Sequence, residues 1–240
     1  MKFYAINPSI NKKVTGHYPQ TKTVIQNCDV WNEPKFIGQV FFQKIDFEPI
    51  TANAVLFDKS KLTDLIYVVG MGFTKKLLVS TRLKLLIEGY RKTGLQFFAS
   101  DILYKGQCVK DYWVLNVYEI NMELIDFNKS TFASRQSKHG GGTYLENVDI
   151  KSLDDFNEKL KQEENYEQLF LHKIKIVENT NQDFFTLLHV EGGVKYVVSE
   201  KLKKEIEDAG CTGIEFQPVE LSLNEWLQDG GEREKIYGKA

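Results

Sequence analysis

Residues 79–97 read VSTRLKLLIEGYRKTGLQF, and residues 198–216 read VSEKLKKEIEDAGCTGIEF. At a constant offset of 119 positions, the two stretches share nine identities in nineteen positions without a gap. Average residue usage would give about one identity, at roughly 6% per position. The chain therefore contains one local pattern twice. The identical pairs are Val79/Val198, Ser80/Ser199, Leu83/Leu202, Lys84/Lys203, Ile87/Ile206, Glu88/Glu207, Thr93/Thr212, Gly94/Gly213 and Phe97/Phe216.

Each copy predicts a strand, a helix and a second strand. An apolar, β-rich run comes first, and Ser80 or Ser199 follows it as a helix N-cap, because a serine hydroxyl can accept a bond from the first helical turn. Apolar side chains then recur at helical spacing until Gly94 or Gly213, which can take positive φ, ends the helix. The alternating Leu-Gln-Phe and Ile-Glu-Phe that follow predict the second strand.

We therefore predict an α+β protein of two similar strand–helix–strand modules, residues 1–132 and 145–240, whose helices pack on a mainly antiparallel sheet. The segment between them, ASRQSKHGGGTY (133–144), is polar and rich in glycine, and we expect it to be a loop. One continuous domain and two lobes both fit this pattern. Every matched residue is a cap, a turn glycine or a core position, so the repeat describes the scaffold and marks no active site.

Residues 151–168 predict a helix with an acidic outer face. Ser152 and Asp155 have capping-box spacing, and Leu153, Phe156 and Leu160 share one face. The acidic face has two interpretations: a surface that mimics phosphates and fits a basic nuclease cleft, or an ordinary solvated face, which is the usual case. Nearer the end of the chain, Ser222 and Glu225 form a second capping box. The acidic side chains are Asp154, Asp155, Glu158, Glu163, Glu164 and Glu167, against Lys159 and Lys161.

Composition excludes several classes of protein. The 31 basic and 33 acidic side chains give a net charge of −2, whereas a dedicated nucleic-acid binder usually carries a basic excess. Cys28, Cys108 and Cys211 are odd in number and form no CxxC pair, which favours a reducing compartment over a disulfide framework. The start lacks the features of a signal peptide, and the longest nearly apolar run, Leu65–Phe73, is too short to span a bilayer. We expect a soluble, cytoplasmic protein.

The search for catalytic and metal-binding motifs yields little. The stretch His139–Gly142 reads HGGG, which supplies oxyanion-hole N–H groups in α/β-hydrolases, but that role needs a GxSxG elbow that this sequence lacks. The histidines are isolated, with no HExxH and no carboxylate cluster at ligand spacing. Gly70 begins GMGFTK, which lacks the spacing of a phosphate-binding loop. We therefore predict no catalytic, metal-binding or cofactor-binding residues.

The order of several short segments resembles immunity proteins of bacterial polymorphic-toxin systems, the myxobacterial-type immunity family eleven, with family forty-three as a sibling. The resemblance implies binding without catalysis: such a protein is made beside a toxin gene and blocks that toxin by forming a complex in the producing cell. The resemblance transfers no functional residues. The segments are GHYPQ (16–20), FDKSKLTDL (57–65), LLVSTRLKLLIE (77–88), GLQFF (94–98), DYWVLNV (111–117), LIDFNKSTF (124–132) and YVVSEKLKKEIEDAGCTGIEFQPV (196–219).

Three functions stay open at this point: an immunity protein, a hydrolase that uses His139 and Gly141, and a general protein-interaction module. For the first, we expect the partner-binding residues on the polar segment and then on the acidic helix, because loops and unpaired charges carry recognition more often than packed strands do. These residues are Arg135, Lys138, His139, Tyr144, Glu163, Glu164 and Glu167.

Overall fold

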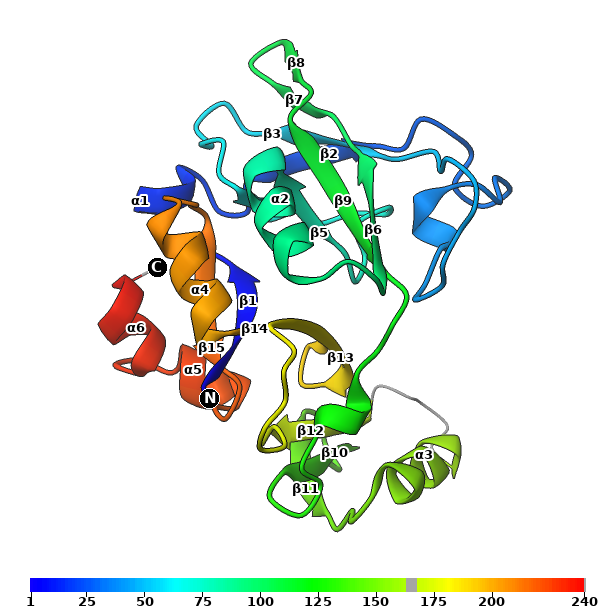
Figure 1. The fold of residues 1–240 in the computed structure, drawn as a ribbon, viewed down its shortest axis with the longest axis vertical. Helices are drawn as coiled ribbons and strands as arrows, with labels where there is room; N and C mark the ends of the chain where they lie inside the picture. The colour runs from blue at the N-terminus through cyan, green and yellow to red at the C-terminus, as the bar shows by residue number, and fades with distance from the viewer. Residues whose placement is uncertain (163–167, 240) are drawn as a thin grey trace. The chain divides into compact units, whose positions relative to one another are not determined.

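The computed structural model describes residues 1–162 and 168–239 (Figure 1). The fold is α+β, as predicted, with mainly antiparallel sheets. The strands are β1 (Phe3–Pro8), β2 (Thr21–Ile25), β3 (Asn53–Leu56), β4 (Leu65–Ile66), β5 (Leu77–Ser80), β6 (Leu95–Ala99), β7 (Ile102–Tyr104), β8 (Gln107–Val109), β9 (Tyr112–Val117), β10 (Thr131–Ser137), β11 (Thr143–Val148), β12 (Leu169–Lys173), β13 (Phe184–Val190), β14 (Gly193–Ser199) and β15 (Ile214–Pro218). The helices are α1 (Lys12–Thr15), α2 (Thr81–Tyr90), α3 (Leu153–Gln162), α4 (Glu200–Asp208), α5 (Leu223–Leu227) and α6 (Glu232–Tyr237), with short 3-10 turns η1 (Ile37–Gln39) and η2 (Met122–Leu124).

The described strands form three sheets. One has the order β11-β10-β12-β13-β14-β1-β15, the second β2-β3-β7-β8 and the third β4-β5-β9-β6. The pairings β12–β13 and β3–β7 are parallel. The N-terminal strand β1 is inserted between two strands from the C-terminal part of the chain, and it pairs antiparallel with β14.

Both copies of the repeated stretch form the predicted elements, β5-α2-β6 and β14-α4-β15. In each copy one further strand, β9 or β1, lies between the two strands of the stretch. The strand that precedes each copy, β4 or β13, also pairs at the same 119-residue offset. Leu65 pairs with Val79 in the first copy, as Phe184 pairs with Val198 in the second. In the same way, Ile66 pairs with Leu78, and Phe185 pairs with Val197.

Hydrogen bonds repeat in the same way. The Ser80 hydroxyl donates to Asp64 and the Ser199 hydroxyl to Asp183, each sixteen residues earlier in the chain. The main-chain N–H of each serine also donates to the carbonyl of the same aspartate, at 2.8 and 2.9 Å. The strand order, these residue pairs and these hydrogen bonds thus recur in the two copies at the same offset.

The helix of the first copy begins where the sequence predicts. The Ser80 hydroxyl accepts a hydrogen bond from the Leu83 N–H at 3.2 Å, so this side chain is the N-cap of α2. Leu83 and Ile87 are fully buried, and α2 packs against β5 and β9. The helical apolar spacing therefore faces the sheet, as the pattern requires.

The chain separates into two compact units, each built from several segments. This division follows contacts in the fold, whereas the boundaries at 132 and 145 follow the sequence pattern and stay a prediction. Unit 1 comprises Met1–Ala5, Asn121–Glu200 and Gln217–Ile236, and unit 2 comprises Ile6–Ile120, Lys201–Phe216 and Tyr237–Ala240, described up to residue 239.

Each unit has its own apolar core. In unit 1, Phe132 at the start of β10 stacks on Phe127 at 5.5 Å between ring centroids and meets Phe156 of α3 at 5.4 Å. This cluster anchors α3 on the base of β10. The unit 2 core includes Phe36, Ile37, Val40, Ala54, Leu78, Ile102 and Val114, all at most 1% exposed.

The segment 133–144 differs from the loop that its composition predicts. Residues 133–137 belong to β10 and residues 143–144 to β11, so only 138–142 forms a turn. The cause lies in tertiary pairing: β10 pairs with β11 on one side and with β12 on the other. Such context overrides the weak strand propensity of polar residues.

Candidate binding surface

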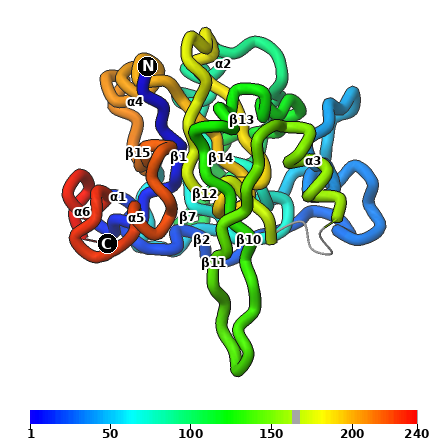
Figure 2. Tube along the Cα trace, turned by 90° about the horizontal axis from the view of Figure 1, so that it is seen from below, coloured from blue at the N-terminus to red at the C-terminus, as the bar shows by residue number. Residues whose placement is uncertain are grey.

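The β10–β11 hairpin extends beyond the other strands of its sheet (Figure 2). Its pairing runs without a register shift from Phe132↔Val148 to Ser137↔Thr143. The base is buried through Phe132, whereas residues 137–144 are all exposed. The sequence thus builds a two-stranded ribbon whose inner end is fixed in the core and whose outer end faces solvent.

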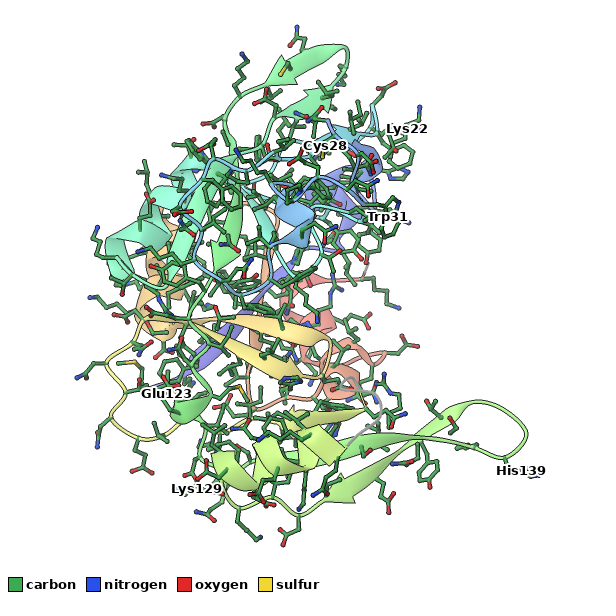
Figure 3. The ribbon with its side chains drawn as sticks, turned by 90° about the vertical axis from the view of Figure 1, so that its right-hand side faces the viewer. Lys22, Cys28, Trp31, Glu123, Lys129 and His139 are labelled. Carbon is green, nitrogen blue, oxygen red and sulfur yellow. The ribbon has the colours of Figure 1, made fainter. Side chains whose placement is uncertain are left out.

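Glycines make the tip of this hairpin. The Lys138 N–H donates to the Gly142 carbonyl at 2.9 Å, and the Gly141 N–H donates to the Lys138 carbonyl at 3.1 Å. Gly140, Gly141 and Gly142 all have positive φ, which a side chain would strain. His139 lies at the very tip (Figure 3). Turn geometry therefore accounts for the HGGG stretch, which here joins two strands.

The predicted partner-binding residues divide into two sets. Arg135, Lys138, His139 and Tyr144 lie together on this hairpin, and all four are exposed. Arg135 is opposite Leu145, so its side chain and that of Tyr144 point to opposite faces of the ribbon. The second set, Glu163, Glu164 and Glu167, lies outside the described residues.

Two contacts hold the inner part of the hairpin. The Arg135 N–H donates to the Gln168 carbonyl at 2.9 Å. The Arg135 guanidinium lies over the Phe170 ring, 5.4 Å from its centroid, in a cation–π arrangement. The Arg135 side chain therefore has a structural role as well as an exposed charge. The bonds of Lys138 that form the turn come from its main chain, so a substitution of the Lys138 side chain tests partner binding more directly.

The described part of the acidic helix is partly neutralised by its own lysines. Lys159 lies 3.4 Å from Asp155 in an i,i+4 ion pair. The Asp155 carboxylate also accepts a bond from the Lys151 N–H, and the Asp155 N–H donates to the Ser152 hydroxyl. The predicted capping pair Ser152–Asp155 is therefore present, and part of the negative charge on this face is balanced by Lys159 of the same helix.

Asp64 lies at the centre of a second polar site, in unit 2. Its side chain is only 6% exposed, and it accepts bonds from the Ser80 hydroxyl, from Arg82 and from the Thr212 N–H. Burial alone would raise the pKa of Asp64, yet these hydrogen bonds outweigh it and hold the pKa below its ordinary value. Both oxygens of the Asp64 carboxylate are occupied by these hydrogen bonds, so this site is a structural junction. A cavity of about 270 Å³ adjoins it, lined by Leu62, Thr63, Asp64, Ser80, Arg82, Val109, Asp111, Tyr112 and Thr212.

Sequence reasoning missed an exposed tryptophan. The Trp31 side chain is exposed, with 77% of the residue's surface open to solvent. The main-chain N–H of Trp31 donates to the Asp29 carboxylate at 3.0 Å. Asn32 donates to the other oxygen of Asp29 at 2.8 Å, which fixes the turn that presents the ring (Figure 3). A tryptophan inside the run NCDVWNEP (27–34), which is rich in turn formers, is the signal that could have revealed it.

Within 1–162 and 168–239, His, Cys, Asp and Glu side chains do not gather into a group of three or more that could hold a metal ion. In the same ranges, every helix is too short or too polar to cross a membrane.

A model of a known protein family matches most of the chain. The family model described as "Immunity protein family (Imm11)" matches residues 2–221 of the 240-residue chain. The match thus includes both copies of the repeated stretch and the β10–β11 hairpin. No curated protein matches.

Proposed function

The chain belongs to the immunity protein family Imm11, and we propose that it binds and neutralises a cognate bacterial toxin in the cytoplasm of the cell that makes both. The observation that carries this proposal is the extent of the family match, residues 2–221. A match of that length covers core residues of both units, so it does not depend on a single short motif. We infer a toxin of a polymorphic-toxin system, encoded by a neighbouring gene, because the segments quoted above resemble immunity proteins of such systems.

We place the toxin contact on the β10–β11 hairpin. Exposed charged and aromatic side chains on a paired ribbon suit recognition, because the strand pairing already orders the backbone that presents them. Lys138, His139 and Tyr144 supply a cation, an imidazole and an aromatic ring within seven consecutive positions. Aromatic and charged anchors of this kind dominate the energy of many interfaces.

The acidic residues Glu163, Glu164 and Glu167 are the second candidate contact. If they mimic phosphates, reversing their charge to lysine would weaken binding and reduce its dependence on salt. We expect the solvated interpretation instead, in which the triple reversal leaves the Kd for the toxin within about twofold, since exposed charges away from an interface contribute little. A larger loss would assign the contact to this segment.

Growth rescue tests the proposed function. Each toxin domain encoded beside this gene is expressed in a test bacterium with and without this protein, and surviving colonies are counted. Rescue from one toxin alone is the expected result and identifies the partner. If both proteins are shown to be expressed and folded and growth is not restored with any of these toxins, the proposal is wrong. An unrelated toxin domain serves as the negative control.

A further inference from the structure

The outer strand of the hairpin is an open sheet edge. β11 ends the seven-stranded sheet, and among the described residues it pairs only with β10. Residues Thr143, Tyr144, Glu146 and Asn147 are exposed. An edge strand presents a row of N–H and C=O groups to which another extended chain can bind.

The alternation of hydrogen bonds identifies the open groups. The Lys138 N–H points to the outer chain of the hairpin, where it binds the carbonyl of Gly142 just before β11. The Arg135 N–H points to the other side, where it binds the carbonyl of Gln168 just before β12. In an antiparallel ladder, successive residues alternate between the two sides. Residues 142, 144 and 146 of the outer chain therefore face β10. The main-chain groups of Thr143, Leu145 and Asn147 point outward from the sheet.

Among the described residues, the other sheet edges are covered, interrupted or short, whereas no described segment covers β11. At β15 the outward Phe216 N–H donates to the Tyr237 hydroxyl at 2.8 Å. At β6 the Gln96 side chain binds both the N–H and the carbonyl of Ile45, which holds another segment against that strand. β2 is bent by a register shift between Thr21 and Thr23, and β4 and β8 have two and three residues.

By contrast, β11 has six residues in unbroken register, no proline and one charged side chain, Glu146. Natural proteins normally protect an edge of this kind with a bulge, a proline, charged side chains or a covering segment. Of these devices, the described part of the chain gives β11 only the single charge of Glu146, which leaves the main chain of this edge open to a partner strand.

We propose that β11 binds an extended segment of the toxin as an eighth strand of the sheet, through the outward main-chain groups of Thr143, Leu145 and Asn147. This inference rests on the proposed function and specifies how the hairpin recognises its partner. Main-chain pairing supplies affinity, and the side chains on β11 select the sequence.

The charge on β11 favours a toxin strand over a second copy of this chain. A cation directly across from Glu146 would be favourable, as would an aromatic or β-branched side chain across from Tyr144. A second copy paired antiparallel about Tyr144 sets Glu146 across from Gly142, and one paired about Leu145 sets Glu146 across from Tyr144. One paired about Glu146 sets two carboxylates face to face. None of these registers supplies a cation, so we expect the toxin segment to carry a basic residue two positions from an aromatic or β-branched one.

Amide exchange tests this inference without any substitution. In the free protein, the N–H groups of Leu145 and Asn147 should exchange with solvent much faster than those of Tyr144 and Glu146, which bind β10. The probe is the toxin domain from which the protein rescues growth. On saturation with that domain, exchange at Leu145 and Asn147 should slow at least tenfold. Unchanged exchange at these two amides in the saturated complex overturns the proposal.

Proline variants provide a second test. Leu145→Pro with Asn147→Pro removes two outward donors and leaves the pairing with β10 intact, because proline is tolerated where the N–H faces outward. The matched control, Leu145→Ala with Asn147→Ala, makes both side chains smaller and keeps both N–H groups. We expect the proline pair to bind the toxin at least about tenfold more weakly than the alanine pair, from two lost hydrogen bonds. Equal affinity of the two pairs contradicts the inference, provided that the amides of Tyr144 and Glu146 stay protected.

Three outcomes are distinguishable. A self-association of the wild type that the proline pair abolishes would assign this edge to a second copy and overturn the proposal. Failure of the wild type to bind or relieve any toxin would remove the proposed function and this inference with it. Tight binding of the toxin by wild type and proline pair alike would leave the function standing and remove the strand-addition mode alone.

Discussion

The main-chain N–H of Thr212 donates to Oδ2 of Asp64 at 2.7 Å, across 148 residues of chain. Thr212 belongs to the second copy of the repeated stretch, while Ser80 and Arg82 of the first copy bind the same carboxylate. Arg82 also donates to the Ala209 carbonyl at 3.2 Å. Within unit 2, one buried carboxylate thus connects the start of α2 with the turn that follows α4.

Removal of that carboxylate should destabilise the protein. Asp64→Ala leaves the hydroxyl of Ser80 and the N–H of Thr212 without their acceptor, at a cost of about 2–4 kcal/mol in the free energy of unfolding. Chemical denaturation of the variant measures this loss. Asp58→Ala, at an exposed aspartate of the same unit, is the control and should change stability by less than about 0.5 kcal/mol.

The pH dependence of the same variant follows from the pKa of Asp64, which the fold lowers. A lowered pKa means that the ionised carboxylate stabilises the folded state above the ordinary pKa of about 4 and loses this effect as the pH falls through the folded value. The difference in stability between wild type and Asp64→Ala should therefore be full at pH 6 and shrink below pH 4. A difference that is constant from pH 6 to pH 2 would contradict this assignment.

Lys195 in β14 should make stability depend on pH in the alkaline range. Its side chain is buried and donates to Gln217 at 3.3 Å, and burial lowers its pKa to about 8. Between pH 8 and about 10 the unfolded chain then binds more protons than the folded one, so this residue makes the folded state more stable as the pH rises. At pH 7 the charged amine is buried at a cost.

Lys195→Met should accordingly raise the free energy of unfolding at pH 7, by about 1–3 kcal/mol, and the gain should narrow towards pH 10. Denaturation at several pH values measures it. Lys175→Met, at a half-exposed lysine of the same unit, is the control and should show no such trend. Suppose instead that Lys195→Met is less stable than the wild type at pH 7 and that the difference in their free energies of unfolding is constant up to pH 10. The buried charge of Lys195 would then not be costly.

The capping box at the start of α5 should be worth about 1 kcal/mol. The Ser222 hydroxyl accepts from the Glu225 N–H, and the Glu225 carboxylate accepts from the Ser222 N–H at 3.0 Å. The hydrogen bond from Lys173, and then those from Ser222, lower the pKa of Glu225 to about 2. Ser222→Ala should lower the melting temperature by roughly 2–4 °C, and Ser222→Thr, which keeps the hydroxyl, by less. Equal losses in the two variants would show that the hydroxyl is not the cause.

Charge reversal at the hairpin tip should weaken toxin binding. Lys138→Glu keeps the turn, because the Lys138 contacts that form it come from the main chain. We expect the Kd to rise about tenfold, as for the loss of a charged anchor at an interface. Lys105→Glu, at the exposed turn of the β7–β8 hairpin, is the matched control. If the two variants bind alike, the contact lies elsewhere, and the exposed Trp31 is then the next residue to replace.

Local signals were sufficient for the repeated elements. Ser80, the apolar spacing behind it and Gly94 act within a few residues of each other, so the strand, cap, helix and turn could be predicted from sequence. The capping box Ser222–Glu225 is confirmed for the same reason. The position of β1 could not be predicted, because its pairs, such as Tyr4↔Val198, join residues almost two hundred positions apart.

The candidate site shows the same division. The polar, glycine-rich composition of 133–144 singled out Arg135, Lys138, His139 and Tyr144, and the structure places all four on one hairpin. Their strand conformation depends on pairing with β12, which no local signal records. Trp31 escaped notice since a single tryptophan in a sequence is more often part of a core than of a surface.

Titration of the purified toxin's activity tests the central claim most directly. If this protein neutralises the toxin by forming a complex, activity should fall in proportion to the amount added and reach zero at about one equivalent, as expected for tight binding. The toxin released from that complex by denaturation and refolding should be active again. Undiminished activity at a large excess, or complete and lasting inactivation by a small fraction of an equivalent, would contradict the account.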